Sequence, residues 1–217
     1  MVAEQVKEYM VAEQVARLLL EVKAVRLRPE EPFTWSSGWK SPIYCDNRIT
    51  LSHPEVRSYI RSELANAIQK QFPGVDAIAG VATAGIAQGA LVADALNLPF
   101  LYVRPEPKKH GMGNQIEGRL EAGQRVVVLE DLISTGGSSL KVVDVLRQSG
   151  AEVLGMAAIF TYGFPVAAQN FADKAVQLVC LSDYETLVEQ ARKLDYIAAD
   201  AMSSLAAWRQ NPAEWNQ

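Results

Sequence analysis

Five short apolar runs, separated in places by helical segments, constrain the fold of this chain more than any other feature. Each run has the length and composition of a buried strand, and they cover Asp76–Ala82, Phe100–Val103, Arg125–Leu129, Val153–Phe160 and Val176–Leu181. Gly85–Asn97 and Ser138–Gln148 have helical patterns, and Gly150 is placed to end the second. The alternation predicts an α/β domain with a mostly parallel central sheet flanked by helices.

The other segments extend this sheet without adding a second domain, so we expect one domain over residues 1–217. A capping box at Ser52–Glu55 predicts a helix that reaches about Gln71. A further box at Ser182–Glu185 predicts a C-terminal helix, followed by a polar, Trp-containing tail. Phe33–Arg48 is rich in aromatic residues, Ser, Gly and Pro and predicts irregular loop and turn. Residues 1–48 would then form an N-terminal helix and hood.

The N-terminus contains a duplication. Met1–Val6 recurs identically as Met10–Val15. On a helix, an offset of nine residues is about two and a half turns, so the two copies face opposite sides. The apolar stripe that can dock belongs to the second copy and comprises Val11, Val15, Leu18, Leu19 and Val22. We therefore expect residues 1–9 to be a dispensable extension.

Composition excludes several classes of protein. The formal net charge of −4 lacks the basic excess typical of nucleic-acid binding. No apolar run approaches the roughly 18 residues that cross a bilayer. Cys45 and Cys180 are the only cysteines, and His53 and His110 are the only histidines, so a disulfide framework or a zinc site is not expected. The chain has the composition of a cytoplasmic globular protein.

The segment Glu130–Ser138 carries the chemistry. It follows a buried strand, and ligands of parallel sheets bind beyond the carboxyl ends of the strands. Its hydroxyls and glycines lead into a helix whose N-terminal N–H groups attract an anion. Glu130 and Asp131 can accept hydrogen bonds from two ribose hydroxyls. The combination predicts a ribose 5-phosphate site, although strand–Gly–helix turns also occur in proteins that bind no phosphate.

Two other loops contain candidate site residues. Gly80, Gly85 and Gly89 lack the spacing of a dinucleotide fingerprint, yet they indicate a tight turn near Val81–Gly85 that could meet an anion. Cationic charge gathers in a Pro- and Gly-rich loop at Arg104, Lys108, Lys109 and His110. This second loop could close over a pyrophosphate, or it could be an ordinary solvated loop.

Several stretches resemble known sequences. Glu130–Ser138 resembles the donor motif of the type I phosphoribosyltransferases, which use 5-phosphoribosyl 1-diphosphate with Mg²⁺. Phe33–Arg48 resembles the N-terminal signature of the orotate phosphoribosyltransferase family. Arg104–Gly111, with Ile116–Gly118, is similar to that family's mobile loop, and Trp208–Pro212 is similar to the ending of bacterial members. The resemblance therefore covers the chain from about Met10 onward.

This resemblance implies a homodimer with shared active sites, in which orotate takes the ribose 5-phosphate and diphosphate leaves. It implies that Lys108, His110 and Asp131 are catalytic and that Mg²⁺ is held mainly by the donor, with Asp131 as a water-mediated contact. The donor-binding set would be Arg104, Lys108, His110, Glu130, Asp131, Leu132, Ile133, Ser134, Thr135, Gly136, Gly137 and Ser138. The orotate-binding set would be Ser134, Lys40, Tyr44 and Cys45.

The chain departs from the family pattern at three places. Many members have lysines where this chain has Ser36 and Ala84, and some have an arginine in the region of Glu152–Phe171, which contains no basic residue here. We expect Lys40, or backbone amides near Tyr44 and Cys45, to hold the orotate carboxylate instead. A purine phosphoribosyltransferase should lack the Phe33–Arg48 signature. A donor-sensing regulator should have a basic DNA-binding extension and lack the catalytic loop.

Overall fold

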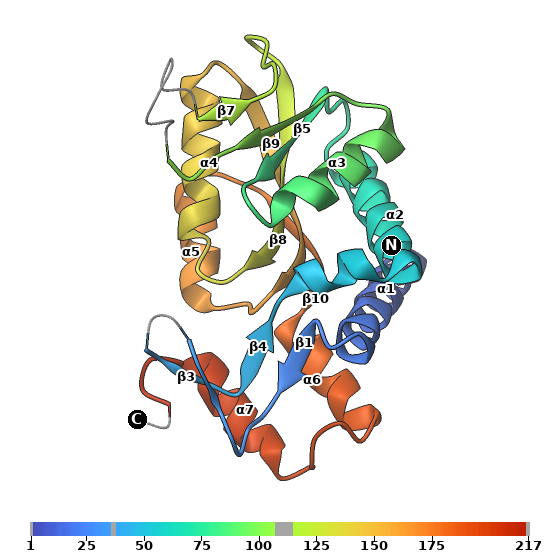
Figure 1. The fold of residues 1–217 in the computed structure, drawn as a ribbon, viewed down its shortest axis with the longest axis vertical. Coiled ribbons are helices and arrows are strands. Elements are labelled where there is room, and N and C mark those ends of the chain that lie inside the picture. The colour runs from blue at the N-terminus through green and yellow to red at the C-terminus, as the bar shows by residue number, and fades with distance from the viewer. Residues whose placement is uncertain (1, 36–37, 107–114, 216–217) are drawn as a thin grey trace.

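A six-stranded sheet forms the centre of the computed structural model, which describes residues 2–35, 38–106 and 115–215. The strand order is β10-β9-β8-β5-β6-β7 (Figure 1). The strands are β5 (Ala77–Val81), β6 (Phe100–Val103), β7 (Ile116–Glu117), β8 (Arg125–Ile133), β9 (Glu152–Thr161) and β10 (Leu178–Asp183). All neighbours pair in parallel except β7, which is antiparallel to β6. The predicted mostly parallel sheet is confirmed.

Helices cover both faces of the sheet (Figure 1). On one side lie α1 (Val2–Glu21), α2 (Pro54–Gln71) and α3 (Gly85–Leu96), and on the other lie α4 (Gly137–Gln148) and α5 (Pro165–Asp173). Successive β8 side chains point to opposite faces, so Val127 and Leu129 join the core beneath α1–α3, while Val126 and Val128 join the core beneath α4 and α5. This explains why β8 is continuously apolar from Val126 to Leu129.

The N-terminal hood contains short antiparallel ladders. Strand β1 (Val25–Leu27) pairs with β4 (Ile43–Cys45), and β2 (Phe33–Thr34) pairs with β3 (Lys40–Ser41). A 3₁₀ helix, η1 (Asn47–Ser52), then leads to α2. The prediction of irregular structure for Phe33–Arg48 was therefore wrong in part. Strands of two or three residues are too short to show an alternating pattern, so only their backbone pairing in the fold reveals them.

The predictions of a capping box at Ser52–Glu55 and at Ser182–Glu185 were both wrong, although the two predicted helices are present. Ser52 belongs to η1, and α2 begins after His53, which makes no side-chain capping bond. At α6 (Tyr184–Lys193), Asp183 Oδ1 accepts a hydrogen bond from the Thr186 N–H at 2.8 Å. The Ser182 hydroxyl instead donates to the carbonyl of Ala12 in α1, at 2.8 Å. The Ser182 side chain, which the sequence motif predicted to cap α6, thus makes a hydrogen bond to a distant helix instead.

The C-terminal tail is not simply polar. It forms α7 (Ala201–Gln210), in which Trp208 is fully buried. Its ring lies 5.3 to 5.7 Å, between centroids, from four aromatic rings, those of Trp35, Tyr162, Phe164 and Tyr184. Because Trp35 belongs to the hood and Tyr162 follows β9, this aromatic cluster joins the hood to the sheet.

Helix α1 contains both copies of the duplicated segment. Val15 and Leu19 are fully buried, whereas the side chains of residues 4–10 are all exposed. The exposed part touches α2 through Lys70, whose ammonium lies 2.8 Å from the carboxylates of Glu4 and Glu8. The second copy is therefore the one that packs. No helix in the described part of the chain is long and apolar enough to cross a membrane.

Candidate active site

The donor loop spans the junction between β8 and α4. Strand β8 continues to Ile133, so Glu130 and Asp131 lie near its carboxyl end. Gly136 then takes a positive φ of 78° and precedes α4. The Leu140 N–H donates a hydrogen bond to the carbonyl of Gly136 at 2.9 Å, which is the first backbone hydrogen bond of the helix. The preceding N–H groups of the first turn therefore have no intrahelical acceptor and are available to an anion.

Neighbouring elements fix the shape of this loop. Asn170 in α5 donates from Nδ2 to the carbonyl of Thr135 at 2.9 Å, and Thr161 donates from Oγ1 to the carbonyl of Ile133 at 3.2 Å. The ring of Phe171 packs against Gly136, where an added Cβ would lie 2.5 Å from Cε2. Together with the positive φ, this contact explains why glycine occupies position 136.

Glu130 is directed into the fold. Its side chain is only 6% exposed. Oε1 accepts a hydrogen bond from the Asp131 N–H at 2.9 Å, and Oε2 accepts one from the Ser139 hydroxyl at 2.8 Å. Burial, followed by the neighbouring charge of Asp131, raises the pKa of Glu130 to about 8. Further hydrogen bonds or a cation at the site would favour its ionised form.

Asp131 is half-buried and faces the hood side of the sheet. Burial raises the pKa of its carboxyl group, while a hydrogen bond with the Glu130 side chain and then the positive charge of Arg48 act in the opposite direction. Arg48 itself makes a bidentate ion pair with Asp46, at 2.7 and 2.9 Å. The Asp131 carbonyl accepts a hydrogen bond from Asn47 Nδ2 at 2.7 Å. The acid pair therefore consists of one enclosed carboxyl group and one that is more accessible.

The candidate orotate ligands lie in two parts of the hood. Cys45 is in β4 and donates from Sγ to Asn47 Oδ1 at 3.4 Å, which links it to Asp131 through one side chain. Burial raises the pKa of Cys45 well above its usual range, so the thiol remains protonated. Tyr44 is 36% exposed. Lys40 is exposed in the β2–β3 hairpin, where its ammonium donates to Thr34 Oγ1 at 3.0 Å.

The turn before α3 approaches the donor loop. A Cβ on Gly85 would collide with the carbonyl oxygen of Leu129, and one on Gly80 would lie 2.8 Å from the carbonyl oxygen of Gly85. The peptide bond between Ala82 and Thr83 is cis. Glycines in this region therefore allow the start of α3 to lie against the end of β8, which brings the two predicted anion-binding turns together.

The residues that resemble the family's mobile loop are only partly described. Arg104 follows β6, its N–H donates to Gln115 O at 2.9 Å, and its Nη1 lies 3.6 Å from a carboxylate oxygen of Glu117. These contacts join the two ends of the loop. Lys108, Lys109 and His110 lie outside the described residues, as does Ser36. Ala84, the other departure from the family pattern, immediately precedes α3.

Three residues near the acid pair were missed by sequence reasoning. Asn47 contacts the Asp131 carbonyl, and Ser139 contacts Glu130. The buried Tyr162 lies close enough to Asp131 for the aspartate charge to raise the pKa of its phenol, after the larger effect of burial. Of the three, only Ser139 could have been suspected from the sequence, because it lies in the first turn of the helix that follows the donor loop. Asn47 is 84 positions from Asp131, so no local pattern pairs them.

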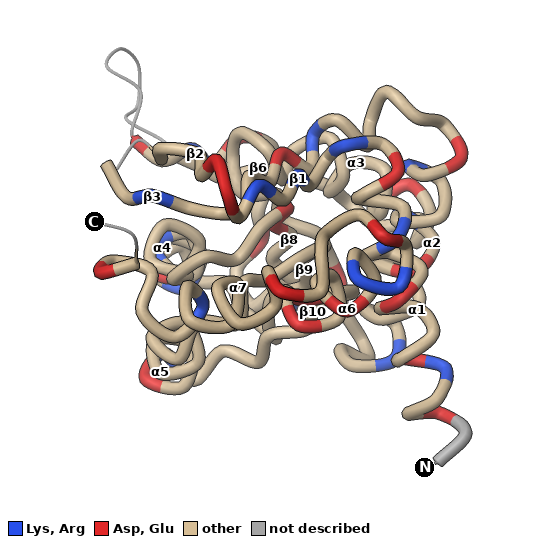
Figure 2. Tube along the Cα trace, turned by 90° about the horizontal axis from the view of Figure 1, so that it is seen from below, with Lys and Arg blue, Asp and Glu red and all other residues tan. Residues whose placement is uncertain are grey.

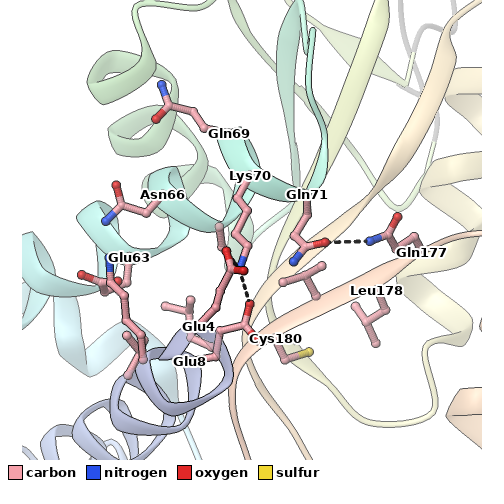
Figure 3. Close-up of a pocket in the computed structure, with 15 residues that line it drawn as sticks. Glu4, Glu8, Glu63, Asn66, Gln69, Lys70, Gln71, Gln177, Leu178 and Cys180 are labelled. Atoms are coloured by element: carbon pink, nitrogen blue, oxygen red, sulfur yellow. Dashed lines mark hydrogen bonds and ion pairs between the residues drawn. The ribbon is translucent and has the colours of Figure 1, made fainter. Parts of the chain in front are cut away.

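Cavity size does not identify this site. A cavity of ≈ 820 Å³ lies between α1, α2 and the edge strand β10, bordered by Glu8, Lys70, Gln177 and Cys180 (Figure 3). A smaller one of ≈ 390 Å³ lies between α4 and α5 and touches the donor loop only at Gly137. We place the site by its chemistry instead, because the acid pair and the unpaired N–H groups meet at the carboxyl end of β8.

Charge and metal-ligand patterns agree with a site for a small anionic ligand. Within the described ranges, His, Cys, Asp and Glu side chains form no group of three that could hold a metal ion. Basic and acidic positions are interspersed along α1 and α2 (Figure 2). Asp131 is the more exposed of the two acids near the end of β8.

Comparisons with known proteins find relatives over most of the chain. A family model described as "Phosphoribosyl transferase domain" matches residues 47–186. An orotate phosphoribosyltransferase of Cytophaga hutchinsonii is 55% identical over 94% of this chain and 98% of its own length. One of Porphyromonas gingivalis is 57% identical, over 93% of this chain and 96% of its own. The crystal structure of orotate phosphoribosyltransferase from Aeropyrum pernix has a TM-score of 0.73 at 33% identity, covering 85% of this chain and 99% of that one.

Proposed function

The chain belongs to the orotate phosphoribosyltransferase family, and from this premise we propose how its residues carry out the reaction. The enzyme transfers the ribose 5-phosphate of 5-phosphoribosyl 1-diphosphate to orotate, giving orotidine 5′-monophosphate and diphosphate in UMP biosynthesis. A bond forms between orotate N1, which gives up its proton, and the ribose C1′ as the bond from C1′ to diphosphate breaks. Positive charge grows on the ring and negative charge grows on the leaving group.

The donor loop would bind the ribose 5-phosphate through two kinds of group. The hydroxyls and free N–H groups of Ser134–Ser138 bind the 5-phosphate, with Leu132 and Ile133 supporting the loop. Asp131, the more accessible acid, accepts hydrogen bonds from the ribose hydroxyls. Glu130 is already hydrogen-bonded on both oxygens and is more buried, so it has less acceptor capacity left for the same ligand. Asp131 therefore has the larger role of the two.

Magnesium would enter with the donor and neutralise charge on the diphosphate. The carboxylate of Asp131, which is more exposed than that of Glu130, would make a water-mediated contact with a cation that is held mainly by the donor. The adjacent turn at Val81–Gly85 presents backbone to the same region. Such an arrangement fits a cation that arrives bound to a substrate better than a resident metal centre.

The mobile loop would complete the site from a second subunit. Arg104, Lys108 and His110 would bind the diphosphate of the partner's donor in a homodimer, with Lys108 and His110 stabilising the leaving group. Closure of the loop would also exclude water that could hydrolyse the donor. On the acceptor side, Ser134, Lys40, Tyr44 and Cys45 would bind orotate. A cytoplasmic location is the final part of this proposal.

One observation carries the proposal: the acid pair and the free N–H groups of α4 meet at the end of β8, below the hood that carries Tyr44 and Cys45. The test is a spectrophotometric assay of orotate loss with the donor and Mg²⁺. Parallel reactions contain adenine, hypoxanthine or uracil in place of orotate. Orotate consumption alone supports the proposal, whereas turnover of a purine would assign the chain to another acceptor. Binding of the donor without any turnover would favour a regulator.

A further inference from the structure

On the side of β8 that faces β5, the backbone of Asp131 is held by side chains, while β9 continues to pair with β8 on the other side as far as Ile133. The parallel register between β5 and β8 extends only to the pair Gly80 and Leu129. Beyond that pair, the Asp131 N–H donates to Glu130 Oε1 at 2.9 Å, and the Asp131 carbonyl accepts from Asn47 Nδ2 at 2.7 Å. The direction of the Asp131 carboxylate therefore depends on these two side chains.

Asn47 is buried and makes hydrogen bonds through both its side chain and its backbone carbonyl. It is 1% exposed, and its own carbonyl accepts a hydrogen bond from the fully buried Thr50 hydroxyl at 2.6 Å. Its Oδ1 accepts the Cys45 thiol at 3.4 Å while its Nδ2 donates to Asp131. An amide can do both because it has a donor and an acceptor on one planar group. An aspartate carboxylate would turn an acceptor toward the Asp131 carbonyl.

The two partners of Asn47 belong to different halves of the site. Cys45 ends β4, the hood strand assigned above to orotate, and Asp131 is assigned to the ribose of the donor. We propose that Asn47 is a positioning residue that sets the orotate-binding strand β4 against the ribose-binding Asp131. This inference rests on the proposed function. Loss of the bridge would misplace the acceptor relative to C1′ while leaving the phosphate-binding N–H groups in place.

The test compares Asn47→Asp and Asn47→Ala with Asn170→Asp. Asn170 is a matched control because its Nδ2 donates to another donor-loop carbonyl, that of Thr135, at 2.9 Å. At pH 8, Asn47→Asp should raise the KM for orotate by about five- to a hundredfold, the effect of leaving a buried acceptor opposite a carboxylate. The donor dissociation constant, measured by calorimetry without orotate, should rise by a smaller factor than this KM, because the N–H groups that bind the 5-phosphate stay in place even if Asp131 shifts. Asn170→Asp should instead weaken donor binding.

A pH profile separates positioning from general support of the fold. In Asn47→Asp, the introduced carboxyl group can donate its O–H to the Asp131 carbonyl once it is protonated, so the KM of this variant for orotate should return toward the wild-type value as the pH falls. Asn47→Ala has no donor at any pH and should show a constant deficit. KM does not depend on the folded fraction, so a variant that only loses stability would lower kcat and leave this constant unchanged.

Three results would overturn the inference. A wild-type orotate KM in Asn47→Asp at pH 8 would show that the bridge is structural only. Equal effects of Asn47→Asp and Asn170→Asp on both substrates would show general loop support. A recovery at low pH in Asn47→Ala would remove the hydrogen-bond explanation. If wild-type protein consumes no orotate, the proposed function itself fails, and that outcome is seen before any variant is made.

Discussion

The Ser139 hydroxyl donates to Glu130 Oε2 at 2.8 Å, closing the donor loop from its last strand residues to the first turn of α4. Ser139 is 2% exposed and Glu130 is 6% exposed, so water competes little for this bond. Together with the Asp131 N–H, the serine satisfies both oxygens of a carboxyl group that burial makes difficult to ionise. Burial of this carboxyl group makes the stability of the free protein sensitive to pH, and the Ser139 bond reduces that sensitivity.

Stability of the free protein should fall between about pH 5 and 8. The pKa of Glu130 is raised to about 8 in the fold from an ordinary value of 4.5, so between these values the folded state holds a proton that the unfolded chain releases. Unfolding then becomes easier as the pH rises. Glu130→Gln should flatten this slope, because the amide keeps the shape without titrating. Melting temperatures of both proteins across this range test the claim.

Ser139→Ala should destabilise the protein more at pH 8 than at pH 5. The hydroxyl favours the ionised form of Glu130, and its removal leaves a buried carboxylate oxygen with one donor fewer, a cost of about 1–3 kcal/mol. The measurement is the free energy of unfolding in denaturant at both pH values. Ser138→Ala, an exposed neighbour in the same turn, is the control. An equal loss at both pH values would contradict the role assigned to Ser139.

Removal of residues 1–9 should change stability by less than about 1 kcal/mol, because the contacts of the segment that the structure describes are exposed ion pairs with Lys70. Lys70→Met should reproduce whatever loss occurs, and roughly 0.5 M salt should abolish it. Leu19→Ala, in the buried part of α1, should cost about 2–5 kcal/mol by comparison. A truncated protein as unstable as Leu19→Ala would show that the first copy packs.

Lys40→Met should weaken orotate binding roughly 10- to 150-fold, the range for a charge-assisted hydrogen bond, and leave donor binding nearly unchanged. Thr34→Val is the matched control, since it removes the hydroxyl that Lys40 contacts at 3.0 Å but keeps the ammonium. Orotate affinity is read from KM with saturating donor. Equal loss for both substrates would mean that Lys40 supports the hairpin instead of the ligand.

Mixed dimers test whether sites are shared between subunits. Lys108→Ala and Asp131→Asn should each be nearly inactive alone. If Lys108 serves the partner's site, a mixed dimer has one site with both defects and one with neither, so random exchange should restore about a quarter of wild-type activity. Co-expressed subunits, confirmed as dimers by sizing, provide the sample. Recovery close to zero in confirmed mixed dimers would place Lys108 and Asp131 in the same subunit's site.

The sequence by itself determined the sheet and the donor loop. Strands β5, β6, β8 and β9 and helices α3 and α4 match the predicted ranges closely, with β8 extending four residues further, from Leu129 to Ile133. These strands could be predicted from the sequence because both faces of the sheet are buried, so each strand contains a run of apolar residues. The donor loop is readable for a similar reason. Its acids, hydroxyls and glycines are contiguous, and the strand and helix beside it fix their direction.

Only the tertiary structure decided what surrounds that loop. The bond from Asn47 to Asp131 spans 84 positions, and the Ser182 hydroxyl contacts Ala12 across 170, so neither has a local pattern. Trp208 was taken for part of a polar tail because a single aromatic residue among polar ones gives no periodicity, yet four other rings enclose it. Local sequence encodes hydrophobic period and loop chemistry. The partners of a buried polar or aromatic group come from distant chain segments, which meet only when the sheet and the hood have packed together.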